Sequence, residues 1–71
     1  MDKNIFKSEL KRLLRQLDQR NRLVELNKKE DSYYQNKRRE FINLIDAATK
    51  EIGFIMPKEN TRIYKIYHDK W

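Results

Sequence analysis

The 71-residue chain contains no cysteine and only one glycine, one proline and one histidine. Without cysteine, neither a disulfide framework nor a thiolate metal site can stabilise the fold. No stretch approaches the roughly 18 to 20 apolar residues of a membrane span, and the start of the chain lacks the apolar run of a signal peptide. We therefore expect a cytoplasmic protein with no membrane partner.

The same scarcity argues against an enzyme. There is no Cys nucleophile and no glycine-rich turn to hold a phosphate, and His68 has no companions at metal-ligand spacing. The length allows one small domain, residues 1–71, and a few short helices offer no concavity of ligand-pocket size. We expect no catalytic residue, cofactor, metal or small-molecule substrate.

Because Gly53 and Pro57 are the only strong helix breakers, the preceding residues favour long helices. At 100° per residue, six apolar side chains gather on one side of a helix over about residues 3–28. They are Phe6, Leu10, Leu13, Leu14, Leu17 and Val24. Asp2 is the expected N-cap of this helix.

The stretch "NKKEDSYYQ" predicts a break, and Ser32 with Gln35 fits a capping box that opens a second helix over about residues 33–52. Gly53 is its expected C′ residue. Its apolar stripe consists of Tyr34, Phe41, Ile45, Ala48 and Ile52. Two long helices with a short connection predict an antiparallel hairpin, in which Phe6 would lie opposite Ile55.

The ending "RIYKIYHDKW" has no clean alternation for a strand, but its apolar residues gather on one side of a helix. We predict a third helix over about residues 58–70, opened by Pro57 or Asn60 and packed on the open end of the hairpin. Four side chains would close that end: Ile63, Tyr64, Tyr67 and Trp71. The predicted fold is all-α, and its small size makes a homodimer plausible.

The formal net charge of +6 favours nucleic acid or an acidic protein surface as the partner. Residues 20–40, the tip of the predicted hairpin, contain seven basic residues against four acidic ones, together with tyrosines and amides. Cations neutralise phosphates and aromatic rings stack on bases. The candidate binding residues are Arg22, Lys28, Lys29, Tyr33, Lys37, Arg38 and Arg39.

The basic tip and a second basic stripe each have a competing interpretation as ordinary charged surface. Arg12 and Arg15 form a second basic stripe on the outer face of the first helix. Arg20 lies on the apolar stripe opposite Phe41, where an ion pair or cation–π contact would fix the register of the helices.

The stretch "AATKEIGFIMPKENTRIYKIY" loosely resembles the turn and recognition helix of helix-turn-helix proteins. That resemblance implies that Thr61, Arg62 and Lys65 would face a DNA groove. Seven residues separate Gly53 from Thr61, however, where about three or four are usual in such a turn.

The sequence thus predicts a non-catalytic, basic helical binding or regulatory protein whose hairpin tip engages nucleic acid or a complex that contains it. The alternative is an inhibitor or adaptor, of the type that phages and mobile elements encode, which docks on a larger host protein. In that case Tyr33 and exposed apolar surface would anchor the partner.

Overall fold

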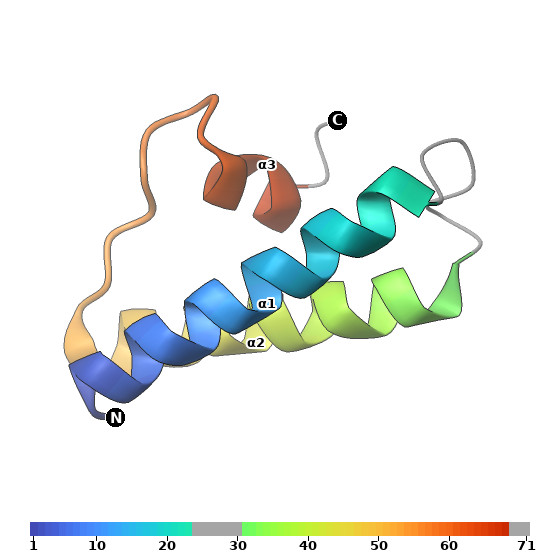
Figure 1. The fold of residues 1–71 in the computed structure, drawn as a ribbon. Coiled ribbons are helices and arrows are strands. Elements are labelled where there is room, and N and C mark those ends of the chain that lie inside the picture. The colour runs from blue at the N-terminus through green and yellow to red at the C-terminus, as the bar shows by residue number, and fades with distance from the viewer. Residues whose placement is uncertain (24–30, 69–71) are drawn as a thin grey trace.

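The computed structural model describes the backbone of residues 1–23 and 31–68 and the side chains of residues 1–20 and 31–68. These residues form three helices and no strand: α1 (Lys3–Leu23), α2 (Ser32–Ile52) and α3 (Arg62–His68). Helices α1 and α2 pack against each other, and α3 lies across them (Figure 1). The predicted all-helical fold is confirmed, whereas the predicted end of the first helix at residue 28 and of the third at residue 70 lie outside the described residues.

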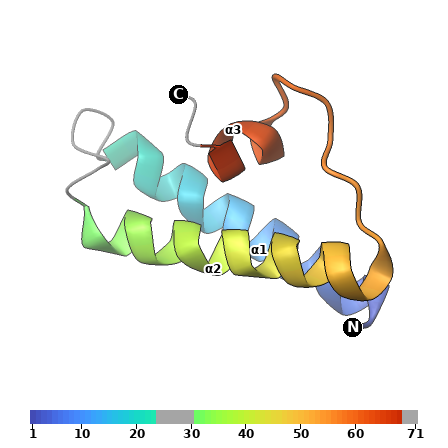
Figure 2. The same ribbon diagram turned by 180° about the vertical axis from the view of Figure 1, so that it is seen from behind.

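Ion pairs at the two ends of α1 show how it lies along α2. The amino group of Met1 lies 3.1 Å from Oε1 of Glu51 in the last turn of α2. Near the other end of α1, Arg20 pairs with Asp31, the residue that precedes α2. The start of α1 therefore lies beside the end of α2, as the reverse view also shows (Figure 2).

Both long helices begin at an aspartate. The Asp2 carboxylate accepts hydrogen bonds from the backbone N–H groups two and three residues later, at 2.7 and 3.2 Å, which confirms the predicted N-cap of α1. Helix α2 starts one residue earlier than predicted, because Asp31 and not Ser32 is its N-cap. The Asp31 carboxylate accepts from the Tyr33 N–H at 3.0 Å while it also pairs with Arg20.

Helix α2 ends where predicted, at a glycine in the left-handed conformation. Gly53 has φ +67°, and the next N–H, from Phe54, donates to the Ala48 carbonyl at 3.2 Å. An L side chain at this φ would be strained, whereas glycine adopts it freely.

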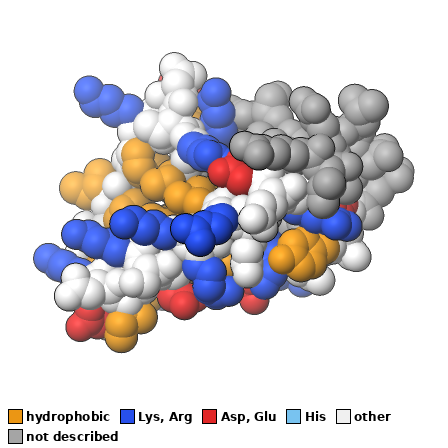
Figure 3. Space-filling view, in the orientation of Figure 1, with side chains coloured by type: hydrophobic (Ala, Val, Ile, Leu, Met, Phe, Trp, Pro, Cys, Tyr) orange, Lys and Arg blue, Asp and Glu red, His pale blue; other side chains and the backbone are white. Residues whose placement is uncertain are grey.

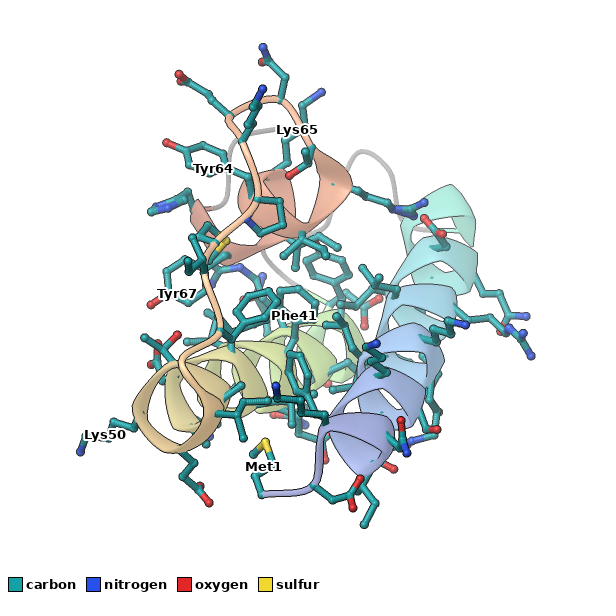
Figure 4. All side chains as sticks on the ribbon, turned by 90° about the vertical axis from the view of Figure 1, so that its left-hand side faces the viewer. Met1, Phe41, Lys50, Tyr64, Lys65 and Tyr67 are labelled. Atoms are coloured by element: carbon teal, nitrogen blue, oxygen red, sulfur yellow. The ribbon has the colours of Figure 1, made fainter. Side chains whose placement is uncertain are left out.

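The core consists of apolar side chains that sequence periodicity placed on the inner faces of the helices. Phe41 lies among all three helices (Figure 4). The buried side chains among the described residues are Phe6, Leu13, Leu17, Tyr34, Phe41, Ile45, Ala48 and Ile66.

The segment after Gly53 covers the open end of the helix pair, where the third helix was expected. Phe54 packs edge-to-face on Phe6 with ring centroids 5.0 Å apart. Ile55, predicted to face Phe6, is 85% exposed. Phe54 and Met56 both pack on the core, as alternate residues of a non-helical segment do.

Helix α3 begins later than predicted because the residues before it cannot be helical. Asn60 has φ +80°, in the left-handed region, so neither it nor Pro57 opens the helix. Thr61 is the cap instead, since its Oγ1 accepts from the Tyr64 N–H at 3.2 Å.

The late start changes where α3 packs. It lies over the middle of the helix pair: Ile66 is buried, and the Tyr67 hydroxyl donates to Asp46 of α2 at 2.7 Å. With Ile63, Ile66 and Tyr67 turned inward, Tyr64 does not close the core as predicted. Figure 4 shows Tyr64 and Lys65 on the side of α3 away from the other helices. The predicted contribution of Trp71 lies outside the described residues.

Candidate functional site

An exposed aromatic ring with two neighbouring cations lies in the first turn of α2. The Tyr33 side chain is 43% exposed. The guanidinium of Arg20 lies 5.3 Å from its ring centroid, and Nζ of Lys37 lies 5.6 Å from it. Both distances are within the range of cation–π attraction. One residue of α1 and two of α2 therefore form this cluster.

Arg20 is held in place by two hydrogen bonds to one carboxylate. Its Nε donates to Oδ2 of Asp31 at 2.5 Å and its Nη2 to Oδ1 at 3.2 Å. The Arg20 hydrogen bond, with help from backbone N–H groups, holds the pKa of the Asp31 carboxyl below its ordinary value. The ion pair and cation–π contact expected at Arg20 are both present, but the partners are Asp31 and Tyr33 rather than Phe41.

A shallow depression of about 170 Å³ adjoins the Tyr33 ring and is lined by Gln16, Gln19, Arg20 and Tyr33. It is smaller than the roughly 300–1,000 Å³ of typical ligand pockets. The Gln16 carbonyl oxygen is buried without a hydrogen-bond partner among the described residues. Such an oxygen costs about 1–3 kcal/mol until a partner satisfies it.

The sequence interpretation did not include Gln16 in any site. The signal was present in the spacing of Gln16, Gln19 and Arg20, which places them on one side of α1. Their proximity to Tyr33 depends on how α1 packs on α2.

The structure separates the predicted tip residues. Arg38 donates from Nε to the Ile66 carbonyl at 2.9 Å and from Nη2 to the Tyr67 carbonyl at 3.1 Å, so it holds the end of α3. Lys37 pairs with Glu40 at 3.4 Å. Arg39 is exposed and has no ion-pair partner within the described part of the chain. The other three predicted tip residues, Arg22, Lys28 and Lys29, lie outside the described side chains.

A row of exposed cations along α1 has no ion-pair partner among the described residues. Lys3, Lys7, Lys11 and Arg15 are exposed, and none has an ion-pair partner among the side chains that the structure describes. Lys and Arg side chains extend across this side of the molecule in Figure 3. Arg12, the other member of the predicted stripe, instead pairs with Glu9 at 2.6 Å. The three lysines were missed, although their four-residue spacing is visible in the sequence.

Most acidic side chains of the described residues are engaged within the fold. Five of them form ion pairs: Glu9, Asp18, Asp31, Glu40 and Glu51. Asp2 caps α1, and Asp46 accepts the Tyr67 hydroxyl. The positive charge that remains is therefore concentrated on lysines and arginines at the surface.

The helix-turn-helix interpretation receives little support from the contacts of α3. Thr61 caps the helix, and Arg62 forms an ion pair with Asp18 of α1. Of the three residues expected to face a groove, Lys65 alone is exposed and has no side-chain hydrogen bond or ion pair within the described region.

No group of three or more His, Asp or Glu side chains is placed to hold a metal ion within residues 1–23 and 31–68. None of the described helices combines the length and apolar character that crossing a membrane requires. Comparisons with protein-family models, with curated proteins and with solved structures found no match.

Proposed function

We propose that this chain is a non-catalytic nucleic-acid-binding protein whose main phosphate contacts come from exposed cations along α1. The observation that supports the proposal is the row formed by Lys3, Lys7, Lys11 and Arg15. All four side chains are exposed and lack an ion-pair partner among the described residues, whereas the carboxylates nearby are engaged elsewhere.

The spacing of this row suits a linear array of negative charge. Residues four apart on an α-helix are separated by about 6 Å along its axis. Duplex DNA carries one phosphate charge per about 1.7 Å of axis, so each cation of the row has a phosphate within reach. Neutralising the phosphates releases their counterions, which makes binding strong at low salt.

In this proposal the predicted tip divides into three groups. Arg38 serves the fold, because its hydrogen-bonding groups point to the carbonyls at the end of α3. Arg39 adds a phosphate contact, as do Lys28 and Lys29 outside the described residues. Tyr33 and Lys37 take no part in contacting the phosphates of a duplex.

Fluorescence anisotropy with a labelled DNA duplex tests the proposal. Reversing three charges of the row, Lys7→Glu, Lys11→Glu and Arg15→Glu, should weaken binding more than tenfold, since each lost phosphate contact also leaves a repulsive carboxylate. A control with equal net charge reverses Lys50, Lys58 and Lys65, which lie on α2, the 54–61 segment and α3.

The control should retain most of the affinity. An equal loss in both triple variants would show that net charge alone matters and that α1 is not the interface. Absence of binding by the wild-type chain at low salt would refute the proposed function.

A second candidate function is supported by a different surface. Ile55 is 85% exposed and Ile5 is 63% exposed, which is unusual for large apolar side chains and favours docking on a protein or on a second copy of the chain. Light scattering with wild type and with Ile5→Ser, Ile55→Ser tests it. A dimer that the double variant converts to monomer would favour this candidate.

A further inference from the structure

We infer that the depression between the end of α1 and the start of α2 is a stacking site for one unpaired nucleobase. This inference rests on the proposed function and deepens it, because it names single-stranded nucleic acid as a ligand of this surface. The site consists of Tyr33, Arg20, Gln16 and Gln19.

The size and openness of the site match one planar group. At about 170 Å³ the depression cannot enclose a drug-sized molecule. Tyr33 is nevertheless 43% exposed, which leaves aromatic surface available for a flat partner. Stacking of bases on exposed aromatic rings is the main sequence-tolerant contact of single-strand-binding proteins.

Arg20 gives the site a fixed second surface. Its guanidinium is planar and lies 5.3 Å from the ring centroid, and two hydrogen bonds to Asp31 hold it there. Bases stack on guanidinium planes as well as on aromatic rings. Because Asp31 is itself fixed as the N-cap of α2, the geometry of Arg20 exists before a ligand arrives.

Gln16 supplies a hydrogen-bond acceptor that the protein does not use. Its side-chain carbonyl oxygen is buried and has no hydrogen-bond partner among the described residues, so the Gln16 amide must turn toward the depression to meet a base. The exocyclic amino group of adenine is a suitable donor, and glutamine pairs with the N6 and N7 edge of adenine in known complexes. Thymine presents a carbonyl there, so the site should favour adenine over thymine.

Nearby cations are placed for the phosphates of the same strand. Arg15 lies one helical turn before Gln19 and has no ion-pair partner in the described region. Among the described residues Lys37, 5.6 Å from the Tyr33 ring, pairs with the exposed carboxylate of Glu40 and can turn toward a phosphate. A strand whose base lies on Tyr33 therefore has a cation of each long helix close to that base.

The test measures anisotropy of labelled oligo-dA, oligo-dT and the duplex that they form. Tyr33→Ala should weaken binding of oligo-dA about tenfold or more, since one stacked base is lost, while duplex binding stays unchanged. Tyr33→Phe keeps the ring and should behave as wild type. Gln16→Met, which removes an unsatisfied carbonyl, should abolish the preference for oligo-dA over oligo-dT.

Each other outcome counts against the inference. If Tyr33→Ala leaves oligo-dA binding intact, or weakens duplex and single strand equally, the stacking site is wrong although nucleic-acid binding through α1 stands. If wild type binds neither form, the proposed function fails and the site with it. Thermal unfolding followed by circular dichroism verifies that each variant is folded. Should Tyr33→Ala unfold, an unchanged base preference in Gln16→Met would itself overturn the inference.

Discussion

Arg38 and Arg39 are adjacent in α2, but their side chains have entirely different surroundings. Arg38 is half-buried and donates to two carbonyls at the end of α3. Arg39 is exposed and has no ion-pair partner among the described side chains. A cation near a helix C-terminus stabilises that end of the helix. The same residue type therefore serves the fold at one position and is available to a partner at the next.

Replacing each of these arginines with glutamine should separate the two roles. Arg38→Gln should lower the free energy of unfolding by about 1–3 kcal/mol, because two carbonyl acceptors lose a charged donor. Arg39→Gln should change it by less than about 0.5 kcal/mol, as is usual for surface substitutions. Chemical denaturation monitored by circular dichroism measures both. Equal stability of the two variants would show that Arg38 does not hold α3.

Asp31 should make stability depend on pH at the acidic end. Its hydrogen bond with Arg20 lowers the pKa of the carboxyl below 3.8, its ordinary value. The resulting stabilisation is complete above 3.8 and is lost as the pH falls through the lower pKa of the folded state.

The matched variant is Asp31→Asn, which keeps an N-cap side chain but has no titrating group. Wild type should be more stable than the variant at neutral pH, and the difference should shrink as the pH falls below 3.8. Denaturant unfolding at a series of pH values measures the difference. A difference that does not vary with pH would mean that the carboxylate form of Asp31 contributes no stability.

At the scale of the helices, periodicity and caps explain how much could be predicted. The apolar stripes of α1 and α2 become the core, and Asp2 and Gly53 mark helix ends because each satisfies backbone groups locally. The start of α3 could not be predicted in the same way. It depends on the left-handed backbone at Asn60. The stretch "PKEN" alone does not show which of its polar residues adopts that conformation.

The position of α3 could not be predicted from the sequence either, for a different reason. Its apolar face, with Ile63, Ile66 and Tyr67, suits any apolar surface of matching size. Phe54 and Met56 cover the open end of the helix pair, and α3 packs over the middle. Which of these segments covers the open end depends on the packing of the whole chain and not on the local sequence.

Because Ile66 is the one fully buried side chain of α3 in the described residues, it should control docking of the whole helix. Ile66→Ala should destabilise α3 by about 2–5 kcal/mol, the usual range for removing a buried isoleucine side chain. Hydrogen exchange should then become fast in α3 while α1 and α2 keep their protection. Lys65→Ala, on the exposed side, should leave exchange unchanged. Protection of α3 in the Ile66→Ala variant would mean that the polar contacts suffice to dock it.

At the scale of the molecule, the distribution of charge differs from that inferred from composition. The tip looks strongly basic in the sequence, but Arg20 and Lys37 are paired with Asp31 and Glu40. The first of these pairs joins residues eleven positions apart and depends on the packing of α1 on α2. By contrast, the row along α1, which has no ion-pair partner in the described part of the chain, follows from a four-residue repeat and can be recognised once the helix is predicted.

The salt dependence of nucleic-acid affinity tests the proposed function most directly. If Lys3, Lys7, Lys11 and Arg15 each contact a phosphate, they should together contribute about −3 to −4 to the slope of the logarithm of the association constant for duplex DNA against the logarithm of salt concentration. The variant with Lys7, Lys11 and Arg15 reversed should bind weakly, and its slope should be shallower than that of wild type by about 3. A wild-type slope near zero, or the same steep slope in the variant, would contradict binding through α1.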